Sequence, residues 1–340
     1  MKIPTTMSAI AISRPGGPEV LEPATAATPT PAAGEVLIAV AAAGVNGPDI
    51  SQRAGAYPPP ADASPLPGLE VSGTVAACGT EASRFAVGDH VVALCNGGGY
   101  AEFVAVPEGQ VLPRPARWSW SQSATLTETF MTIQQTLVER AGLREGHWVL
   151  VHGGAGGIGA AAIQMCRLFG AKAIATAGTG QKADYAREMG ALETIVYPDE
   201  DFVSRVREIT GDRGVDIVLD IVGGSYGNRN LRSLTRGGHL LQLAVREGAK
   251  SEINLGLVLM QQLTISGSTL RPQSAATKAR LAGGLGKTVW PAIERGAVVP
   301  PRIRTFPLAD ASAAHTVMES GDHFGKIVLV TPYGMSDTDD

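Results

Sequence analysis

The sequence predicts an α/β protein built from a mostly antiparallel β domain and a doubly wound parallel sheet of six strands. Three observations support this fold class. The 340 residues are enough for about two domains, each with a core of its own. Up to about residue 120, short extended runs are separated by Gly and Pro, which is typical of a turn-rich β domain. Beyond residue 146, strand-like runs alternate with helical ones, and this alternation predicts a parallel sheet.

The expected elements follow in that order along the chain. The first part should contain strands over residues 35–43, 69–77, 90–94 and 100–106, and then a helical stretch over residues 121–143. The parallel sheet should use residues 148–152, 172–176, 193–197, 215–221, 239–244 and 263–267. Apolar residues share one face of a helix over residues 158–169, which ends at Gly170. A last helix over residues 277–295 precedes a return segment that ends in KIVLV.

Charge and composition limit the classes of partner. The net charge is −4 and no run of Lys or Arg is present, so we expect a small-molecule substrate and neither nucleic acid nor a membrane surface. The most apolar stretch, residues 36–45, is too short to cross a bilayer, and the first residues lack a signal-peptide pattern, which favours a cytoplasmic protein. Cys78, Cys95 and Cys166 form no CxxC motif, and we expect small buried residues of a reducing compartment.

The sequence GAGGIG at residues 154–159 fits the pattern GxGxxG directly between an expected strand and an expected helix. In this context Gly154 allows a tight turn, Gly156 lets the backbone approach a pyrophosphate, and Gly159 lets the helix pack closely on the strand. N–H groups at the helix N-terminus then bind the phosphates. A purely structural glycine-rich turn is the alternative, but the six expected strands favour a dinucleotide-binding Rossmann domain.

The end of the second expected strand of that sheet indicates which dinucleotide binds. NAD sites of this type usually carry Asp or Glu here to hold the ribose 2′-hydroxyl, but this chain has Ala177, Gly178 and Thr179. These small residues leave room for a 2′-phosphate, and Lys182 follows at a distance from which its ammonium could reach one. We therefore expect NADPH as the cofactor. The alternative for Lys182 is a solvated lysine on a helix surface.

Nine stretches spread over nearly the whole chain point together to one family: RPGGPEVLE (14–22), GVNGPDISQRAGAYPPP (44–60), LPGLEVSGTV (66–75), VGDHVVAL (87–94), GGGYAEFVAVP (97–107), HGGAGGIG (152–159), DIVGG (220–224), ISGSTLR (265–271) and GKIVL (325–329). They resemble the zeta-crystallin-like NADPH:quinone oxidoreductases, which are zinc-independent medium-chain dehydrogenases/reductases. The resemblance implies a GroES-like catalytic domain over residues 1–128 and 271–340 and a Rossmann NADPH-binding domain over residues 129–270. It also implies a homodimer, and a sheet edge at residues 262–270 would otherwise be exposed.

The zinc-dependent enzymes of that superfamily differ from this chain at their ligand positions. They use Gly-His-Glu where this chain has Gly68-Leu69-Glu70, and they place a cysteine near the position of Asn46. Leucine cannot ligate a metal and three scattered cysteines cannot form a four-cysteine lobe, so we expect no metal. Removing the proton of an alcohol needs a Lewis acid or a well-placed base. Hydride transfer to a quinone or an α,β-unsaturated carbonyl needs less help, because the product anion is delocalised.

The resemblance also assigns site residues. Asn46 matches the family asparagine near the nicotinamide and the substrate, and Tyr57 matches a tyrosine that lines the substrate pocket and acts as hydrogen-bond donor or acid. A phenol is protonated at neutral pH, so Tyr57 could donate to a quinone or enolate oxygen. The alternatives are that Asn46 caps a turn and that Tyr57 packs on a rigid loop. The implied cofactor contacts, glycine loop included, are Thr132, Gly154, Gly156, Gly157, Ile158, Gly178, Lys182, Tyr197, Ala244, Ser268, Leu270 and Lys326.

The sequence thus predicts an NADPH-dependent, zinc-free oxidoreductase that transfers a hydride from nicotinamide C4 to a quinone. Two alternatives stay open. An NADPH-dependent enoyl-thioester or enone (2-alkenal) reductase uses the same fold, and fold does not fix the substrate. A non-catalytic, crystallin-like NADPH-binding protein is the other, and the intact Asn46 and Tyr57 argue against it.

Overall fold

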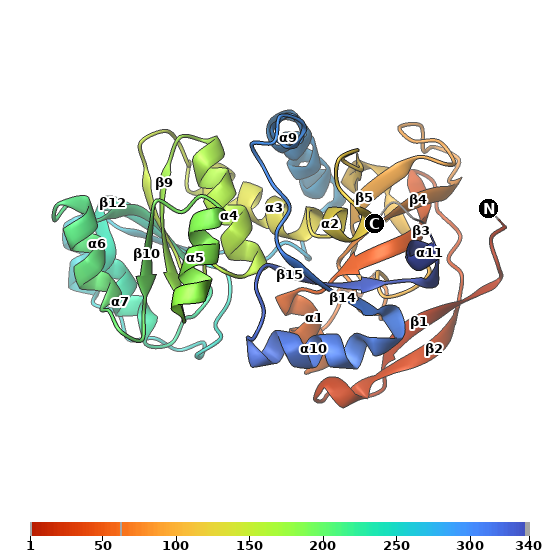
Figure 1. Ribbon diagram of the computed structural model, residues 1–340, viewed down its shortest axis with the longest axis horizontal. Helices are drawn as coiled ribbons and strands as arrows, with labels where there is room; N and C mark the ends of the chain where they lie inside the picture. The colour runs from red at the N-terminus through yellow and green to blue at the C-terminus, as the bar shows by residue number, and fades with distance from the viewer. Residues whose placement is uncertain (1, 62, 337–340) are drawn as a thin grey trace. The chain divides into compact units, whose positions relative to one another are not determined.

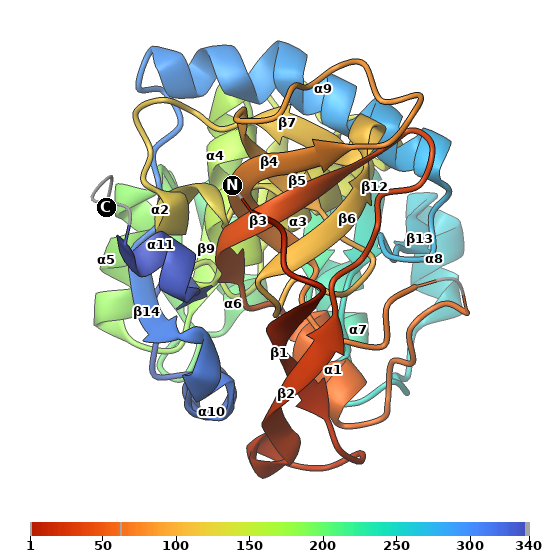
Figure 2. The same cartoon turned by 90° about the vertical axis from the view of Figure 1, so that its right-hand side faces the viewer.

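The computed structural model describes residues 2–61 and 63–336 of the chain. The chain forms two compact units: unit 1 holds the residues up to 131, 271–296 and those from 300 on, and unit 2 holds residues 132–270 and 297–299 (Figures 1 and 2). The chain passes from unit 1 to unit 2 after residue 131, returns to unit 1 after residue 270, and enters unit 2 once more for residues 297–299. Each unit has its own sheet and its own hydrophobic core.

Unit 1 contains the strands β1 (Thr6–Ile12), β2 (Leu21–Ala27), β3 (Glu35–Gly44), β4 (Glu70–Cys78), β5 (His90–Leu94), β6 (Phe103–Pro107), β7 (Val111–Pro113), β14 (Ile303–Pro307) and β15 (Lys326–Val330). Seven of them form one sheet in the order β14-β15-β3-β4-β5-β7, with β6 paired to β3 beside this path. Only the β14–β15 pairing is parallel, which confirms the mostly antiparallel prediction. The antiparallel pair β1–β2 forms a separate small sheet (Figure 2).

Three strands of unit 1 that the sequence pattern missed contain a proline. These are β2 with Pro23, β7 with Pro113 and β14 with Pro307. Proline lacks the N–H that a central strand needs, and it therefore counts against a strand in sequence patterns. The structure tolerates these prolines because β7 and β14 are the two edges of the large sheet and β2 belongs to a two-stranded one.

The helices of unit 1 are α1 (Gly47–Arg53), α2 (Trp120–Ser123), α3 (Thr127–Ile133, whose last residues belong to unit 2), α9 (Ala275–Glu294), α10 (Ala311–Ser320) and α11 (Pro332–Ser336), with 3-10 turns η1 (Pro18–Val20), η2 (Glu108–Gln110) and η4 (Leu308–Asp310). The helical stretch expected over residues 121–143 is interrupted and divides into α2, α3 and a π-helical segment η3 (Gln134–Arg140). Thr125 lies at the first break, and its hydroxyl donates to Gln122 O at 2.7 Å. Such side-chain bonds compete with helix continuation.

Unit 2 contains the strands β8 (Trp148–Val151), β9 (Lys172–Ala177), β10 (Glu193–Val196), β11 (Val215–Asp220), β12 (Leu234–Gln242) and β13 (Thr264–Gly267). They form a parallel sheet in the order β10-β9-β8-β11-β12-β13, which confirms the six-stranded doubly wound prediction. Its helices are α4 (Gly157–Leu168), α5 (Gly180–Glu188), α6 (Phe202–Thr210), α7 (Tyr226–Ser233) and α8 (Leu255–Gln261). Helices α4 and α5 lie on one side of the sheet, and α6 and α7 on the other (Figure 1).

The burial of the three cysteines and the absence of a membrane-spanning segment are two further expectations from the sequence. Cys95 and Cys166 are buried as expected, but Cys78 is only partly buried because it ends β4, where its Sγ approaches Phe85 O. No helix within the described residues is both long enough and apolar enough to span a membrane.

Candidate functional site

In unit 2 the glycine loop joins β8 to α4, at the point where the strand order of the sheet reverses. A Cβ atom on Gly154 would lie 2.6 Å from Ala175 Cβ, and one on Gly159 would lie 2.6 Å from Gly154 Cα. Both positions therefore need glycine for the loop to pack on β9. A Cβ atom on Gly156 would meet nothing closer than Gly153 O, at 3.6 Å. The space beside Gly156 is therefore open to a ligand.

Helix α4 begins at this loop without a capping side chain. Its N-cap residue, Gly156, has no hydroxyl or carboxylate to accept from the first-turn N–H groups of Gly157, Ile158 and Gly159. These donors and the positive end of the helix dipole suit an anionic group. The loop and the helix start thus have the form that a pyrophosphate site requires.

A buried chain of hydrogen bonds supports the loop from below. The Gly153 N–H donates to Thr176 Oγ1 at 3.3 Å, and Thr176 Oγ1 lies 3.1 Å from His152 Nδ1. His152 Nε2 lies 2.8 Å from Asn230 Oδ1, and Asn230 Nδ2 donates to Asp220 Oδ2 at 2.9 Å. Burial lowers the pKa of His152, so the ring is neutral, with Nε2 as donor and Nδ1 as acceptor. The chain ties β8, β9 and β11 together beneath the loop.

The residues expected around a 2′-phosphate lie close together at the ends of β9 and β10. A Cβ atom on Gly178 would lie 2.9 Å from the hydroxyl oxygen of Tyr197, so glycine makes room for this phenol. Thr179 caps α5 by accepting from the Lys182 backbone N–H at 3.3 Å. This places Lys182 in the first turn of α5, just after the strand. No carboxylate stands among Ala177, Gly178 and Thr179, the residues at this strand end.

The remaining expected contacts of unit 2 lie at strand ends or at the start of the unit. Ala244 follows β12, Ser268 and Leu270 follow β13, and Thr132 lies in α3. Ser268 donates its backbone N–H to Gln242 O at 3.2 Å, but its hydroxyl is buried without a hydrogen-bond partner among the described residues. A buried hydroxyl without a partner costs free energy unless a ligand or water satisfies it. Ser268 is therefore a candidate contact for a bound group.

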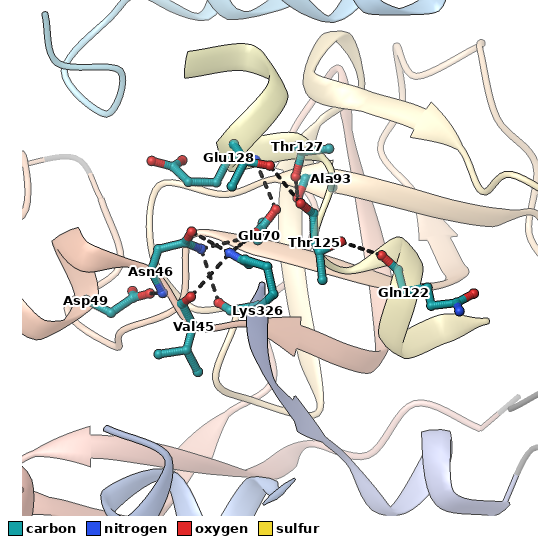
Figure 3. Close-up of polar contacts among 12 residues, drawn as sticks. Val45, Asn46, Asp49, Glu70, Ala93, Gln122, Thr125, Thr127, Glu128 and Lys326 are labelled. Atoms are coloured by element: carbon teal, nitrogen blue, oxygen red, sulfur yellow. Dashed lines mark hydrogen bonds and ion pairs between the residues drawn. The ribbon is translucent and has the colours of Figure 1, made fainter. Parts of the chain in front are cut away.

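In unit 1 the carboxylate of Glu70 joins several elements (Figure 3). Its Oε1 accepts from Lys326 Nζ at 2.6 Å and from Asn46 Nδ2 at 2.9 Å, while its Oε2 accepts from the Glu128 backbone N–H at 3.0 Å. Lys326 Nζ also donates to Asn46 Oδ1 at 2.6 Å and to Val45 O at 3.2 Å. The side chains of Glu70 and Lys326 are 0% and 4% exposed. This is a fully buried, fully hydrogen-bonded ion pair.

The network engages two residues that the sequence assigned to the site. Lys326, expected beside the nicotinamide, uses all three ammonium donors within unit 1, so a cofactor contact would replace one of these bonds. Asn46 uses both ends of its amide and is also the N-cap residue of α1. Asn46 and Lys326 therefore hold the site together through Glu70.

Asp49 lies beside this network in the first turn of α1. Its Oδ2 accepts from the Asn46 N–H at 2.9 Å and its Oδ1 accepts from the Gly68 N–H at 3.0 Å. Burial raises the pKa of Asp49 to about 6, although the two N–H donors, Lys326 and Arg271 partly offset this effect. The carboxylate of Asp49 thus fixes the loop before β4 to the start of α1.

Glu128 is a site residue that the sequence did not reveal. It stands in the first turn of α3 and is only 7% exposed. Burial, together with the nearby carboxylates of Glu70 and Asp49, raises the pKa of Glu128 to about 8. The carboxyl group is therefore mostly protonated at neutral pH. The only signal in the sequence is a single acid in an uncharged run, which alone does not indicate a site.

Tyr57 follows α1 and is partly buried. Burial raises the pKa of its phenol, Glu128 raises it further once that acid is ionised, and Arg271 lowers it. Arg271 donates to Gln52 Oε1 at 2.7 Å and to Asn96 O at 2.7 Å, which anchors the guanidinium near the phenol. Unit 1 thus places Tyr57, Glu128 and a fixed cation in one region.

Two family models match this chain. The model described as alcohol dehydrogenase GroES-like domain matches residues 32–116, and the one described as zinc-binding dehydrogenase matches residues 157–282. The first falls in unit 1 and most of the second in unit 2. Such a pair of domains defines the medium-chain dehydrogenases/reductases, a class of oxidoreductases.

Individual relatives show which family of this class the chain belongs to. Quinone oxidoreductase of Rattus norvegicus is 31% identical over 327 residues, which cover 95% of this chain and 98% of the relative. The structure of Escherichia coli quinone oxidoreductase complexed with NADPH is 30% identical with a TM-score of 0.83, and the match covers 95% of this chain and 99% of that one. CurK enoyl reductase is 27% identical with a TM-score of 0.85, over 97% and 100% of the two chains. The chain belongs to the quinone oxidoreductase family.

The name of one family model implies zinc, and the donor set of this chain does not fit it. Among the described residues, no three His, Cys, Asp or Glu side chains gather in a way that could hold a metal ion. The carboxylate of Glu70 is already neutralised by the Lys326 ammonium, and its neighbour Leu69 has no donor atom.

Replacing Lys326 by methionine would leave the Glu70 carboxylate buried without a cation. We expect K326M to lose about 3–5 kcal/mol of unfolding free energy, the usual cost of breaking a buried ion pair from one side. Urea unfolding followed by circular dichroism measures this loss. The control is R187M, which removes a pair whose side chains are 53% and 70% exposed and should cost less than about 1 kcal/mol. Equal stability of the two variants would contradict the central role of the pair.

Proposed function

We propose that this protein is an NADPH-dependent reductase that transfers a hydride to a quinone and a proton to the reduced product. The observation that carries the proposal is the presence of Tyr57 and Glu128 in unit 1. The phenol is protonated at neutral pH by its ordinary pKa, and the carboxyl group is mostly protonated because burial raises its pKa to about 8. Protonated groups suit reduction, because the reduced acceptor takes up a proton. The quinone oxidoreductases among the relatives support a quinone as the acceptor.

For the cofactor we propose NADPH, held at the carboxyl edge of the parallel sheet. The uncapped start of α4, the open space beside Gly156 and the buried hydroxyl of Ser268 support this binding mode. The absence of an acid at the end of β9 and the position of Lys182 favour a 2′-phosphate over a 2′-hydroxyl. The proposed contacts in unit 2 are Thr132, Gly154, Gly156, Gly157, Ile158, Gly178, Lys182, Tyr197, Ala244, Ser268 and Leu270. When bound, NADPH supplies a hydride from nicotinamide C4.

The residues of unit 1 then serve the acceptor. The Tyr57 phenol donates its proton to the reduced oxygen, and the nearby Arg271 guanidinium lowers the pKa of the phenol and so favours its deprotonated form. Asn46 and Lys326 act through Glu70, because their polar atoms are engaged with its carboxylate and with each other. They fix the start of α1, from which the chain leads to Tyr57.

The second candidate is reduction of an enone or enoyl thioester. The enoyl reductase among the structural neighbours favours it, and the chemistry is related, because hydride at the β-carbon yields an enolate that a phenol can protonate. A non-catalytic NADPH-binding protein is the outcome if no acceptor is reduced.

We expect the dissociation constant for NADPH to be at least about tenfold lower than that for NADH, since a charge-assisted contact contributes about 1.5–3 kcal/mol and 1.4 kcal/mol is tenfold. Fluorescence titration of both nucleotides measures the ratio. K182A should reduce the preference severalfold, while K250A, an exposed lysine of the same unit, should leave it unchanged. Equal affinities of the wild type for NADPH and NADH would contradict the 2′-phosphate assignment.

Y57F removes the phenolic proton and little else. We expect it to lower kcat by about 10²-fold or more with the best acceptor and to leave the dissociation constant of NADPH unchanged. NADPH oxidation should be followed with ortho- and para-quinones, short enones and 2-enoyl-CoA side by side. Preference for enoyl-CoA would favour the second candidate. Unchanged turnover of Y57F would reduce Tyr57 to a residue that lines the pocket.

We also propose that the protein is a homodimer joined through the β13 edge. This strand is one of the two edges of the parallel sheet, the other being β10, and the helix before β13 exposes Leu255, Leu259 and Met260 at 69%, 75% and 69%. Exposed apolar side chains beside an unpaired edge are typical of an interface. Analytical ultracentrifugation should find a wild-type dimer that L259K dissociates and that V87K, at another exposed apolar residue, does not. A monomeric wild type would exclude this interface.

A further inference from the structure

A cavity of about 480 Å³ is lined only by residues of unit 1. Its wall is formed by β6, by the loops around residues 64–66 and 96–98, and by residues 271–275, which lead into α9. Met7, Leu66 and Phe103 make part of it apolar, and among its described lining residues only Arg271 and Glu35 carry charge. The volume is in the range of sites for small molecules. Arg271 therefore borders a space that can hold a small organic ligand.

The guanidinium of Arg271 is fixed in place by neutral acceptors. Its Nη1 donates to Gln52 Oε1 at 2.7 Å, and its Nε and Nη2 donate to Asn96 O at 3.2 and 2.7 Å. No carboxylate within the described part of the chain forms an ion pair with it. An arginine that is only 4% exposed is usually paired with an acid. These bonds use three of the five N–H donors, so two donors are left for a ligand.

Two acids influence Arg271 without bonding to it. Burial, the largest effect, lowers the pKa of the guanidinium, while the charges of Asp49, Tyr57 and Glu128 raise it. Asp49 accepts from two backbone N–H groups instead, and Glu128 is mostly protonated at neutral pH. Arginine does not lose its proton in proteins. The positive charge at the cavity wall therefore has no neutralising contact within unit 1.

The loop at Gly97 holds this guanidinium closely. A Cβ atom on Gly97 would lie 3.0 Å from Arg271 Nη2 and 2.6 Å from Ser64 O, and the residue has a φ of +124°. A side chain here would both strain the backbone and displace the guanidinium. The close approach of the two loops thus fixes the cation at the cavity wall.

Further donors border the same cavity. The Oδ1 of Asn96 accepts from the Lys278 ammonium, which orients the amide, and its Nδ2 has no partner among the described residues. Helix α9 begins at the cavity, where its N-cap residue Ser274 accepts from the Thr277 N–H at 3.2 Å and leaves the N–H of Ala275 uncapped. A guanidinium, an amide N–H and the positive end of a helix dipole all favour an anion.

Gln110 lines the cavity and needs a hydrogen-bond donor. Its Nε2 donates to Leu94 O at 3.3 Å, which orients the amide, and its Oε1 is buried without a partner among the described residues. The residue is only 1% exposed. A buried acceptor without a donor costs free energy unless a ligand or a water molecule satisfies it. A hydroxyl group on a ligand would supply the missing donor.

We propose that this cavity binds a small aromatic hydroxy acid, with its carboxylate on Arg271 and Asn96 and its hydroxyl donating to Gln110 Oε1. The planar guanidinium matches the two oxygens of a carboxylate, and the apolar part of the wall suits a ring. Glu35 accepts from the Ala32 N–H at 2.9 Å, and its charge opposes a second acidic group on the ligand. The inference does not rest on the proposed function, because neither cofactor nor acceptor enters it.

Isothermal titration of the whole protein without NADPH, in a phosphate-free buffer at pH 7, tests the site. The probes are para-hydroxybenzoate, para-hydroxyphenylacetate and para-hydroxyphenylpropionate, which differ in the separation of the two polar groups. At least one should bind with a Kd below about 1 mM. Its neutral carboxamide should bind about 10- to 100-fold more weakly, since a charge-assisted contact is lost. The analogue without the hydroxyl should bind severalfold more weakly.

Variants locate the binding in the cavity. R271M should weaken the best acid about 10- to 100-fold, and R271K, which keeps the charge, should weaken it less. A105L, at a half-buried lining residue of β6, should weaken it by filling the cavity without changing any charge. R14M, at an exposed arginine of the same unit that does not line the cavity, should bind like the wild type.

Each outcome decides for or against the site. Weaker binding by R271M and A105L but not by R14M supports the proposal, and if circular dichroism shows that R271M is unfolded, A105L decides alone. The proposal is overturned if none of the three acids binds the wild type below about 10 mM. It is equally overturned if the acid and its carboxamide bind alike, or if A105L binds as tightly as R14M. None of these results bears on whether the protein reduces a quinone.

Discussion

The buried pairing of Glu70 with Lys326 is the interaction on which unit 1 depends. Its two partners come from β4 and β15, which are 256 residues apart in the chain, and the same carboxylate binds Asn46 at the start of α1 and the N–H of Glu128 in α3. The approach is so close that a Cβ atom on Gly44 would lie 2.5 Å from Ala124 O and closer still to Glu70 Oε1. One ion pair thus fixes four elements and requires a glycine at the end of β3.

This pairing also determines the electrostatics of its neighbours. Because Lys326 is engaged by Glu70, it does not form an ion pair with Glu128, and the Glu70 charge disfavours ionisation of that second acid. The result is one carboxylate whose ion pair with Lys326 holds the structure together and one carboxyl group that is mostly protonated at neutral pH. Unit 2 uses a comparable device, since the neutral ring of His152, just after β8, contacts Thr176 on β9 and Asn230 on α7, and Asn230 in turn binds Asp220 at the end of β11. In both units a buried polar network supports the chain segments that we assign to ligands.

Much of the fold follows from local patterns in the sequence, but the site depends on contacts between residues that are far apart in the sequence. The parallel strands, α4 and the glycine loop were predictable because apolar period and glycine spacing are local properties. The proline-containing edge strands and the break at Thr125 were missed, since tertiary context decides whether a proline or a side-chain bond is tolerated. Asn46, Tyr57 and Lys326 were identified through resemblance. The bonds of Lys326 to Glu70 and the protonation of Glu128 could not be predicted, because both arise from burial among segments far apart in sequence.

The central claim is that this arrangement keeps Glu128 protonated at neutral pH. Infrared difference spectra between wild type and E128Q, recorded as the pH is raised, test it most directly because they report the carboxyl group itself. The account predicts a protonated-carboxyl band in the wild type that is present at pH 7 and disappears through about pH 8. A carboxylate signal for Glu128 already at pH 6 would contradict the account.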